Sequence, residues 1–213
     1  MAFNIINSRR PFIIMNLDFF YHALGNDLKD ETLFSLIKSL HFYSSSDYVD
    51  EFLHTKSEMG VIEKRSPNNY RYGEYTFISM LRQFGQEYVN ALNIVNELGL
   101  SIFPKLIKSF EYDDGGMVVF IKIPWNIGED IKWGSCLLDV YDLPESARQK
   151  AVDDLKKLEE VGYLLLPKFR FSVGVTPNGH VMIPNIPLVR KEDAQNIIDD
   201  IYSRYSMFGW KKA

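Results

Sequence analysis

The sequence predicts an α+β fold in which an antiparallel sheet packs with helices, and three features indicate it. Residues 86–98 place apolar side chains at the three- and four-residue steps of an amphipathic helix. Two β-rich runs, 102–111 and 117–123, flank a turn rich in aspartate and glycine and are typical of a hairpin. A second hairpin is predicted around Asn178-Gly179, because this dipeptide favours tight turns between strands.

Composition narrows the class of protein. The chain has 213 residues, of which 46% are hydrophobic and 14% aromatic, so we expect a folded protein with a sizeable core. The net charge is −4 and no long basic block occurs, which argues against nucleic-acid binding. The single cysteine, Cys136, excludes an internal disulfide and fits a reducing compartment.

The sequence shows neither a membrane span nor a Sec signal. No apolar run approaches the roughly 20 residues that cross a bilayer. Residues 1–10 lack the apolar core and the small-residue cleavage site of a Sec leader. We therefore expect a cytoplasmic protein or one that is secreted by another route.

The first 41 residues are predicted to be mostly helical. Asp30 or Thr32 is the expected cap of a helix with one apolar stripe. That stripe comprises Leu33, Leu36, Ile37 and Leu40. The aromatic run at residues 19–21 (Phe19, Phe20, Tyr21) is interpreted as core, with a partner-binding patch as the alternative.

The next elements lead up to the first hairpin. Residues 44–47 (Ser-Ser-Ser-Asp) are interpreted as an exposed loop or, alternatively, as a loop that covers a phosphate group. Residues 60–65 are predicted as a strand. From Gly73 the apolar spacing turns helical and continues to Val95, with a break near Gly85.

The C-terminal part alternates helix, hairpin and helix. Residues 144–162 are predicted as a helix, and its charged side, within 146–158, is interpreted as a solvated surface. Strands at 172–175 and 180–183 flank the second hairpin turn. A last helix is predicted over residues 192–205.

In this order the elements of residues 42–205 resemble a protein kinase, specifically the minimal OspG/NleH-like kinases that bacteria inject as type III effectors. Residues 61–64 resemble the strand that carries the phosphate-gripping lysine, here Lys64. Glu87 resembles the helix-borne glutamate that pairs with this lysine. The resemblance implies a two-lobed minimal kinase-like fold, with an antiparallel small-lobe sheet plus a helix and a truncated helical large lobe. The implied domains are an N-terminal helical extension (1–41), the small lobe (42–124) and the truncated large lobe (125–213).

The residues that catalyse phosphoryl transfer in kinases are missing. Leu166 stands at the position of the catalytic aspartate and Phe171 at that of the metal-binding asparagine, while Pro-Asn-Ile at 184–186 replaces Asp-Phe-Gly. Leucine, phenylalanine and proline side chains neither accept a proton from a hydroxyl group nor bind magnesium. An alternative register places Asn178 at the asparagine position, but Val173 is then the catalytic residue.

The remaining polar residues give no sign of other chemistry. Lys64 and Glu87 are the candidate residues of a vestigial nucleotide pocket, with plain surface charge as the alternative. Asp113 and Asp114 are interpreted as turn formers. The four histidines lack metal-like spacing, and Cys136 has no pattern that would activate its thiol. We predict no catalytic residue and no metal site.

We therefore predict a pseudokinase that acts by binding another protein. The resemblance implies a host protein as the partner, delivery to a host cytosol by a non-Sec route, and for OspG-like kinases a link to the ubiquitin-conjugation machinery. No cofactor is expected to be required, and ATP binding stays open. Candidate contact surfaces are residues 19–21 and the aromatic tail, which comprises Tyr202, Tyr205, Phe208 and Trp210.

Two other classes of protein remain as alternatives. A nucleotide-dependent transferase built on this fold, for example one that moves AMP, needs acidic residues in the cleft, and residues 163–187 contain none. An unrelated α+β immunity or regulatory protein would lack the lobe of one helix and five strands that the resemblance implies.

Overall fold

The structure is a computed structural model, and it describes residues 30–123, 132–134, 145–165, 173–175, 180–184, 186 and 188–196. The chain divides into two compact units, Met1–Ser39 and Leu40–Ala213. Each unit is considered separately below. The described part is mixed α+β, as the sequence predicts.

The first unit contributes helix α2 (Glu31–Leu40). Its N-terminus is capped by Asp30, whose Oδ1 accepts the backbone N–H groups of Thr32 at 3.0 Å and Leu33 at 3.1 Å. Of the two expected caps, Asp30 is therefore the one used. The side chains of the predicted apolar stripe are buried, which confirms the periodicity: Leu33, Leu36, Ile37 and Leu40.

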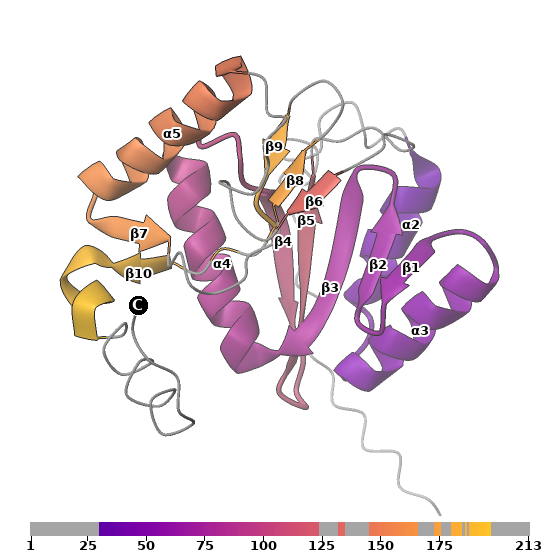
Figure 1. The fold of residues 1–213 in the computed structure, drawn as a ribbon. Helices are drawn as coiled ribbons and strands as arrows, with labels where there is room; N and C mark the ends of the chain where they lie inside the picture. The colour runs from indigo at the N-terminus through magenta and orange to yellow at the C-terminus, as the bar shows by residue number, and fades with distance from the viewer. Residues whose placement is uncertain are drawn as a thin grey trace, which may run out of the picture. The chain divides into compact units, whose positions relative to one another are not determined.

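The second unit contains a five-stranded antiparallel sheet (Figure 1). The order of its strands in space is β1-β2-β3-β5-β4. The first three strands follow one another through short turns, whereas β4 and β5 form the predicted hairpin. The strands are β1 (Glu63–Ser66), β2 (Asn69–Tyr72), β3 (Tyr75–Leu81), β4 (Lys105–Glu111) and β5 (Gly116–Lys122).

Helix α4 (Arg82–Glu97) connects β3 to β4 and covers one face of the sheet. Alternate residues of a strand point to opposite faces, and Met117, Val119 and Ile121 of β5 pack with the buried side of α4. Gly85 permits this close approach, because a Cβ there would lie 3.2 Å from Cβ of Met117. The helix runs through Gly85, where the sequence predicts a break.

Helix α3 (Ser46–Glu58) lies against the opposite face of the sheet. Ser79 of β3 donates a hydrogen bond to Asp50 of α3. Ser79 is in register with Val118 of β5. The side chain of Val118 points to the face opposite to the one that packs with α4. Residues 44–47 are predicted as a loop, whereas Ser46 and Asp47 form the first turn of this helix.

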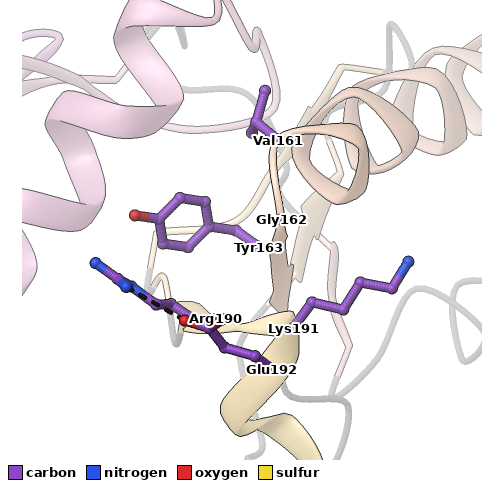
Figure 2. Close-up of a pocket in the computed structure, with 6 residues that line it drawn as sticks. All are labelled: Val161, Gly162, Tyr163, Arg190, Lys191 and Glu192. Carbon is purple, nitrogen blue, oxygen red and sulfur yellow. Dashed lines mark hydrogen bonds and ion pairs between the residues drawn. The ribbon is translucent and has the colours of Figure 1, made fainter.

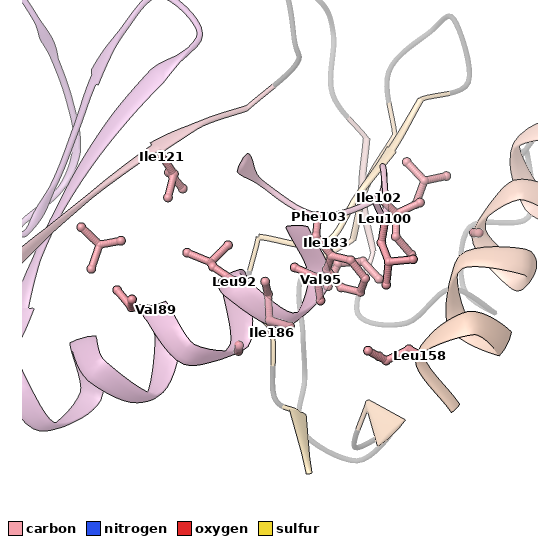
Figure 3. Close-up of a cluster of buried hydrophobic side chains, with 14 of the residues drawn as sticks. Val89, Leu92, Val95, Leu100, Ile102, Phe103, Ile121, Leu158, Ile183 and Ile186 are labelled. Carbon is pink, nitrogen blue, oxygen red and sulfur yellow. The ribbon is translucent and has the colours of Figure 1, made fainter. Parts of the chain in front are cut away.

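One hydrophobic cluster connects α4 to later segments of the second unit (Figure 3). Leu92 of α4 is fully buried in it together with Leu158 of helix α5 (Glu145–Glu160). Ile183 and Ile186 pack into the same cluster. Helix α5 confirms the helix predicted over residues 144–162.

Short antiparallel strands complete the second unit. The two strands of the second predicted hairpin pair as expected, and its turn at Asn178-Gly179 lies outside the described residues. The pairs are β7 (Tyr163–Leu165) with β10 (Leu188–Arg190), and β8 (Val173–Val175) with both β9 (Val181–Met182) and β6 (Lys132–Gly134).

The main correction concerns residues 75–81, which the sequence predicts as helical and which form strand β3. This strand is central, so it is covered on both faces and shows no alternation of polar and apolar residues. Its aromatic and β-branched content favours a strand. The last helix is described only over residues 191–196 of the predicted 192–205.

Candidate functional site

The structure does not bring the two predicted nucleotide-pocket residues together. Lys64 is exposed on the edge strand β1, with its Nζ 5.7 Å from the centre of the Tyr70 ring. Glu87 is exposed on α4, which contacts β3, β4 and β5. No ion pair joins them within the described part of the chain. The resemblance predicts that residues 61–64 belong to the strand that leads into this helix. In the structure, strands β2 and β3 come between Lys64 and α4 in the chain, so this prediction is not met.

Strand β3, which does lead into α4, contains no lysine. Its polar side chains that are buried are Thr76 and Ser79. Ser79 is already engaged with Asp50 of α3. No cation therefore projects from this strand toward the neighbouring helix.

The predicted catalytic-loop positions are described only in part. Leu166, Phe171, the middle residue of the 184–186 triplet, Cys136, the 19–21 run and the aromatic tail lie outside the described residues. Pro184 is described, and its carbonyl accepts a 2.6 Å hydrogen bond from the hydroxyl of Tyr88. Burial raises the pKa of Tyr88, so this phenol stays protonated. The contact joins α4 to the segment that the resemblance aligns with Asp-Phe-Gly.

Residues 44–47 form the start of α3, and a carboxylate of the chain itself occupies that start. Oδ2 of Asp114 accepts the Oγ–H of Ser45 at 2.7 Å, and the N–H and Oγ–H of Ser46 at 2.6 and 2.8 Å. Ser45 is the N-cap and accepts the N–H of Asp47 at 3.2 Å. Because these donors already serve Asp114, they are not open to a phosphate group.

The carboxylate of Asp114 is held in its ionised form. Desolvation opposes ionisation, but the hydrogen bonds from Gly116, Ser45 and Ser46 outweigh it and hold the pKa of Asp114 well below its usual range. Gly116 leaves room for this contact, because a Cβ there would overlap the side chain of Ser46. Asp114 is thus a turn residue, as predicted, and also the link between the β4–β5 hairpin and α3.

A second carboxylate that the sequence analysis assigns to a solvated surface is buried. Asp154 of α5 has a side chain only 6% exposed. It accepts the N–H and the Oγ–H of Ser101 at 2.8 and 3.1 Å, and the N–H of Ile102 at 3.4 Å. These bonds fix α5 to the loop that connects α4 and β4, which is a structural role.

The described part of the second unit also contains a surface cavity of about 520 Å³ (Figure 2). It lies where the end of α5 and the start of β7 meet the end of β10. The residues that line it are Val161, Gly162, Tyr163, Arg190, Lys191 and Glu192.

The charges around the cavity are balanced in pairs. Arg190 Nη1 lies 3.3 Å from Glu192 Oε1, and Lys191 Nζ lies 2.8 Å from Glu159 Oε1. The hydrogen bond from Lys191 lowers the pKa of Glu159, and Tyr163 also bonds with Arg190. Neither cation in the lining lacks a counter-charge.

The described residues contain neither a metal-binding cluster nor a membrane-spanning helix. In residues 30–123 and the later described segments, no group of three or more His, Cys, Asp or Glu side chains is arranged to hold a metal ion. Within the same residues, none of the helices has the length and apolar character needed to cross a membrane. Comparison of the chain with models of protein families, with curated proteins and with solved structures found no match.

Proposed function

We propose that this chain is a catalytically inactive, kinase-like protein that acts by binding another protein. The observation that carries the proposal is the absence of a lysine from β3, the strand that leads directly into α4. In protein kinases this strand supplies the lysine that grips the nucleotide phosphates, and the following helix supplies its glutamate partner.

The kinase-like part of the proposal is supported by the order of the elements. The resemblance implies a lobe of five antiparallel strands and one helix. The sheet β1–β5 has five antiparallel strands, with α4 inserted between β3 and β4. The strands β8 and β9 that follow α5 pair as the predicted second hairpin. Topology alone carries no chemistry, so activity has to be judged from the residues.

The inactive part is supported by what surrounds the expected phosphate site. Lys64 is on the edge strand, Glu87 forms no ion pair in the described part of the chain, and β3 offers no cation. Leu166 and Phe171 replace the catalytic aspartate and the metal-binding asparagine in the sequence. At these positions a nucleoside triphosphate would therefore find neither a lysine nor metal ligands to offset its charge. The role that remains is binding to another protein. In the effector setting that the resemblance implies, this partner is a host protein.

The test is a thermal-shift titration of the full chain with ATP, with and without magnesium, combined with a phosphoryl-transfer assay. A ligand that binds only the folded state raises its unfolding temperature by an amount set by concentration over Kd. We expect no shift and no transfer for the wild type, for Lys64→Ala, or for the matched control Lys105→Ala on the other edge strand. A magnesium-dependent shift that is lost in Lys64→Ala and kept in Lys105→Ala would overturn the proposal.

A further inference from the structure

Helix α3 exposes apolar side chains that its own packing does not use. Tyr48 is 59% exposed and Met59, just after the last turn, is 64% exposed. Phe52 lies between them and is partly buried, with its ring 5.5 Å from that of Tyr43. At about 100° per residue, the three side chains fall within about 40° of one another around the helix axis. We call them the outer stripe.

The outer stripe is separate from the side that holds α3 in place. Val49 and Leu53 are the buried residues of the helix and have no exposed surface. They are displaced from Tyr48 by about 100° and 140° around the axis. Large apolar side chains on a helix surface, arranged in a stripe instead of singly, are the usual mark of a protein-binding surface.

Acidic residues border the outer stripe along the side away from Val49. Asp47, Glu51 and Glu58 are all exposed, and their spacing of four and seven residues places them in one row. His54 falls on the same side of the helix, with its Nε2 3.4 Å from Oε1 of Glu58. The one lysine of α3, Lys56, lies on the other border, with its Nζ 5.5 Å from the centre of the Phe52 ring. The surface thus combines an apolar centre with a negatively charged edge.

We propose that the outer stripe of α3 is a docking surface for a basic amphipathic helix of a partner protein. Apolar residues at helical spacing on the partner would cover Tyr48, Phe52 and Met59, as the apolar face of an amphipathic helix does when two helices pack. Lysine or arginine residues beside them would face the acidic row, and this complementarity selects a basic partner. The inference rests on the proposed protein-binding function and assigns it to a surface.

The surface is tested by selecting random peptides displayed on phage against the full-length protein. We expect the enriched peptides to carry apolar residues at three- and four-residue spacing and a net positive charge. Their enrichment should fall about tenfold on Tyr48→Ala/Met59→Ala, because the variant truncates two central apolar anchors of the interface. Glu51→Lys/Glu58→Lys should reduce it by a similar factor and weaken its salt dependence.

The control variants are Phe84→Ala, which truncates a 56% exposed residue of α4, and Glu160→Lys at the end of α5. Both should leave enrichment unchanged, and equal unfolding temperatures would show that every variant is folded. The proposal is overturned if enriched peptides are neutral or acidic, if none depends on the α3 variants, or if sedimentation shows a dimer that Tyr48→Ala dissociates. Peptides that bind elsewhere would refute this surface yet leave the protein-binding function standing, whereas ATP turnover would refute that function and not the surface.

Discussion

Helices α4 and α3 cover opposite faces of the same sheet, but different forces hold them. Helix α4 buries Val89, Leu92 and Val95 in the large apolar cluster, and it follows β3 without an intervening residue. Helix α3 buries only Val49 and Leu53. The rest of its attachment is polar, through Asp114 at its start and Asp50 in its second turn.

The difference separates a helix that builds the fold from one that presents a surface. Buried apolar side chains occupy most of the side of α4 that faces the sheet. Polar contacts at the first turns of α3 fix it with few buried residues, so its other side can carry exposed apolar groups. On this account a substitution on the buried side of α4 acts on stability, whereas a substitution on the outer stripe acts on binding.

The largest expected effect is therefore on α4. Leu92→Ala should lower the free energy of unfolding by about 3 kcal/mol, because a fully buried leucine leaves a cavity in the cluster. Tyr48→Ala on the outer stripe should change it by less than about 0.5 kcal/mol. Urea unfolding of both variants measures the two values, and similar losses would contradict the assignment of different roles to the helices.

The same contrast explains what the sequence could predict. The apolar spacing of α4 and the hairpin of β4 and β5 are local patterns, and both are found in the structure. The start of α3 depends on Asp114, which is 68 residues away from Ser46, so no local pattern records the contact. The local signals for this helix were the N-cap Ser45, with Asp47 in the first turn, and the four-residue spacing of Val49 and Leu53.

The central strand and the candidate site were harder to predict for related reasons. Ile78 and Leu81 continue the spacing of α4, so the pattern alone extends the helix into β3. Because residues 75–81 were predicted as helix, residues 61–64 became the nearest predicted strand before that helix. The role of the kinase lysine was therefore given to Lys64. The burial of Asp154 depends on donors 52 and 53 residues away, which no helix pattern reveals.

A smaller loss of stability is expected when the link between the hairpin and α3 is removed. Asp114→Ala should cost about 1 kcal/mol or less, because the donors of Ser45 and Ser46 lose a charged acceptor at an exposed site, where water partly replaces the interaction. The control Asp193→Ala, an exposed residue of the 191–196 helix, should have no effect. Chemical denaturation at pH 7 measures both, and equal values would refute the link.

The pH dependence of this contribution follows from the depressed pKa of Asp114. The stabilisation is fully present above the pKa of an unfolded aspartate, about 3.9, and is lost as the pH falls through the lower folded value. The difference between wild type and Asp114→Ala should therefore be constant from pH 7 to about 5 and shrink only in strong acid. A difference that disappears near pH 6 would contradict this assignment.

The smallest expected effect is a gain of stability at the other polar anchor of α3. Desolvation raises the pKa of Asp50, and the hydrogen bond from Ser79 and the charge of Lys64 only partly oppose this, while Asp47 and Asp114 add to it. The ionised form is therefore disfavoured in the folded state, so Asp50→Asn should slightly stabilise the protein at pH 7, and solvent screening keeps the gain small because the side chain is only partly buried. The gain should diminish as the pH falls through the raised folded pKa of Asp50, because the wild-type side chain then becomes neutral in the folded state as well. A loss of stability at pH 7 would show that its charge supports the fold.

The most direct test of the difference between the two helices is hydrogen exchange, followed by mass spectrometry, on the wild type and on Asp114→Ala. If polar contacts hold α3 and apolar burial holds α4, peptides from residues 46–58 should exchange faster in the variant. Peptides from residues 82–97 should exchange at the wild-type rate, because the apolar cluster is intact. Equal acceleration in both helices, or none in α3, would contradict the account.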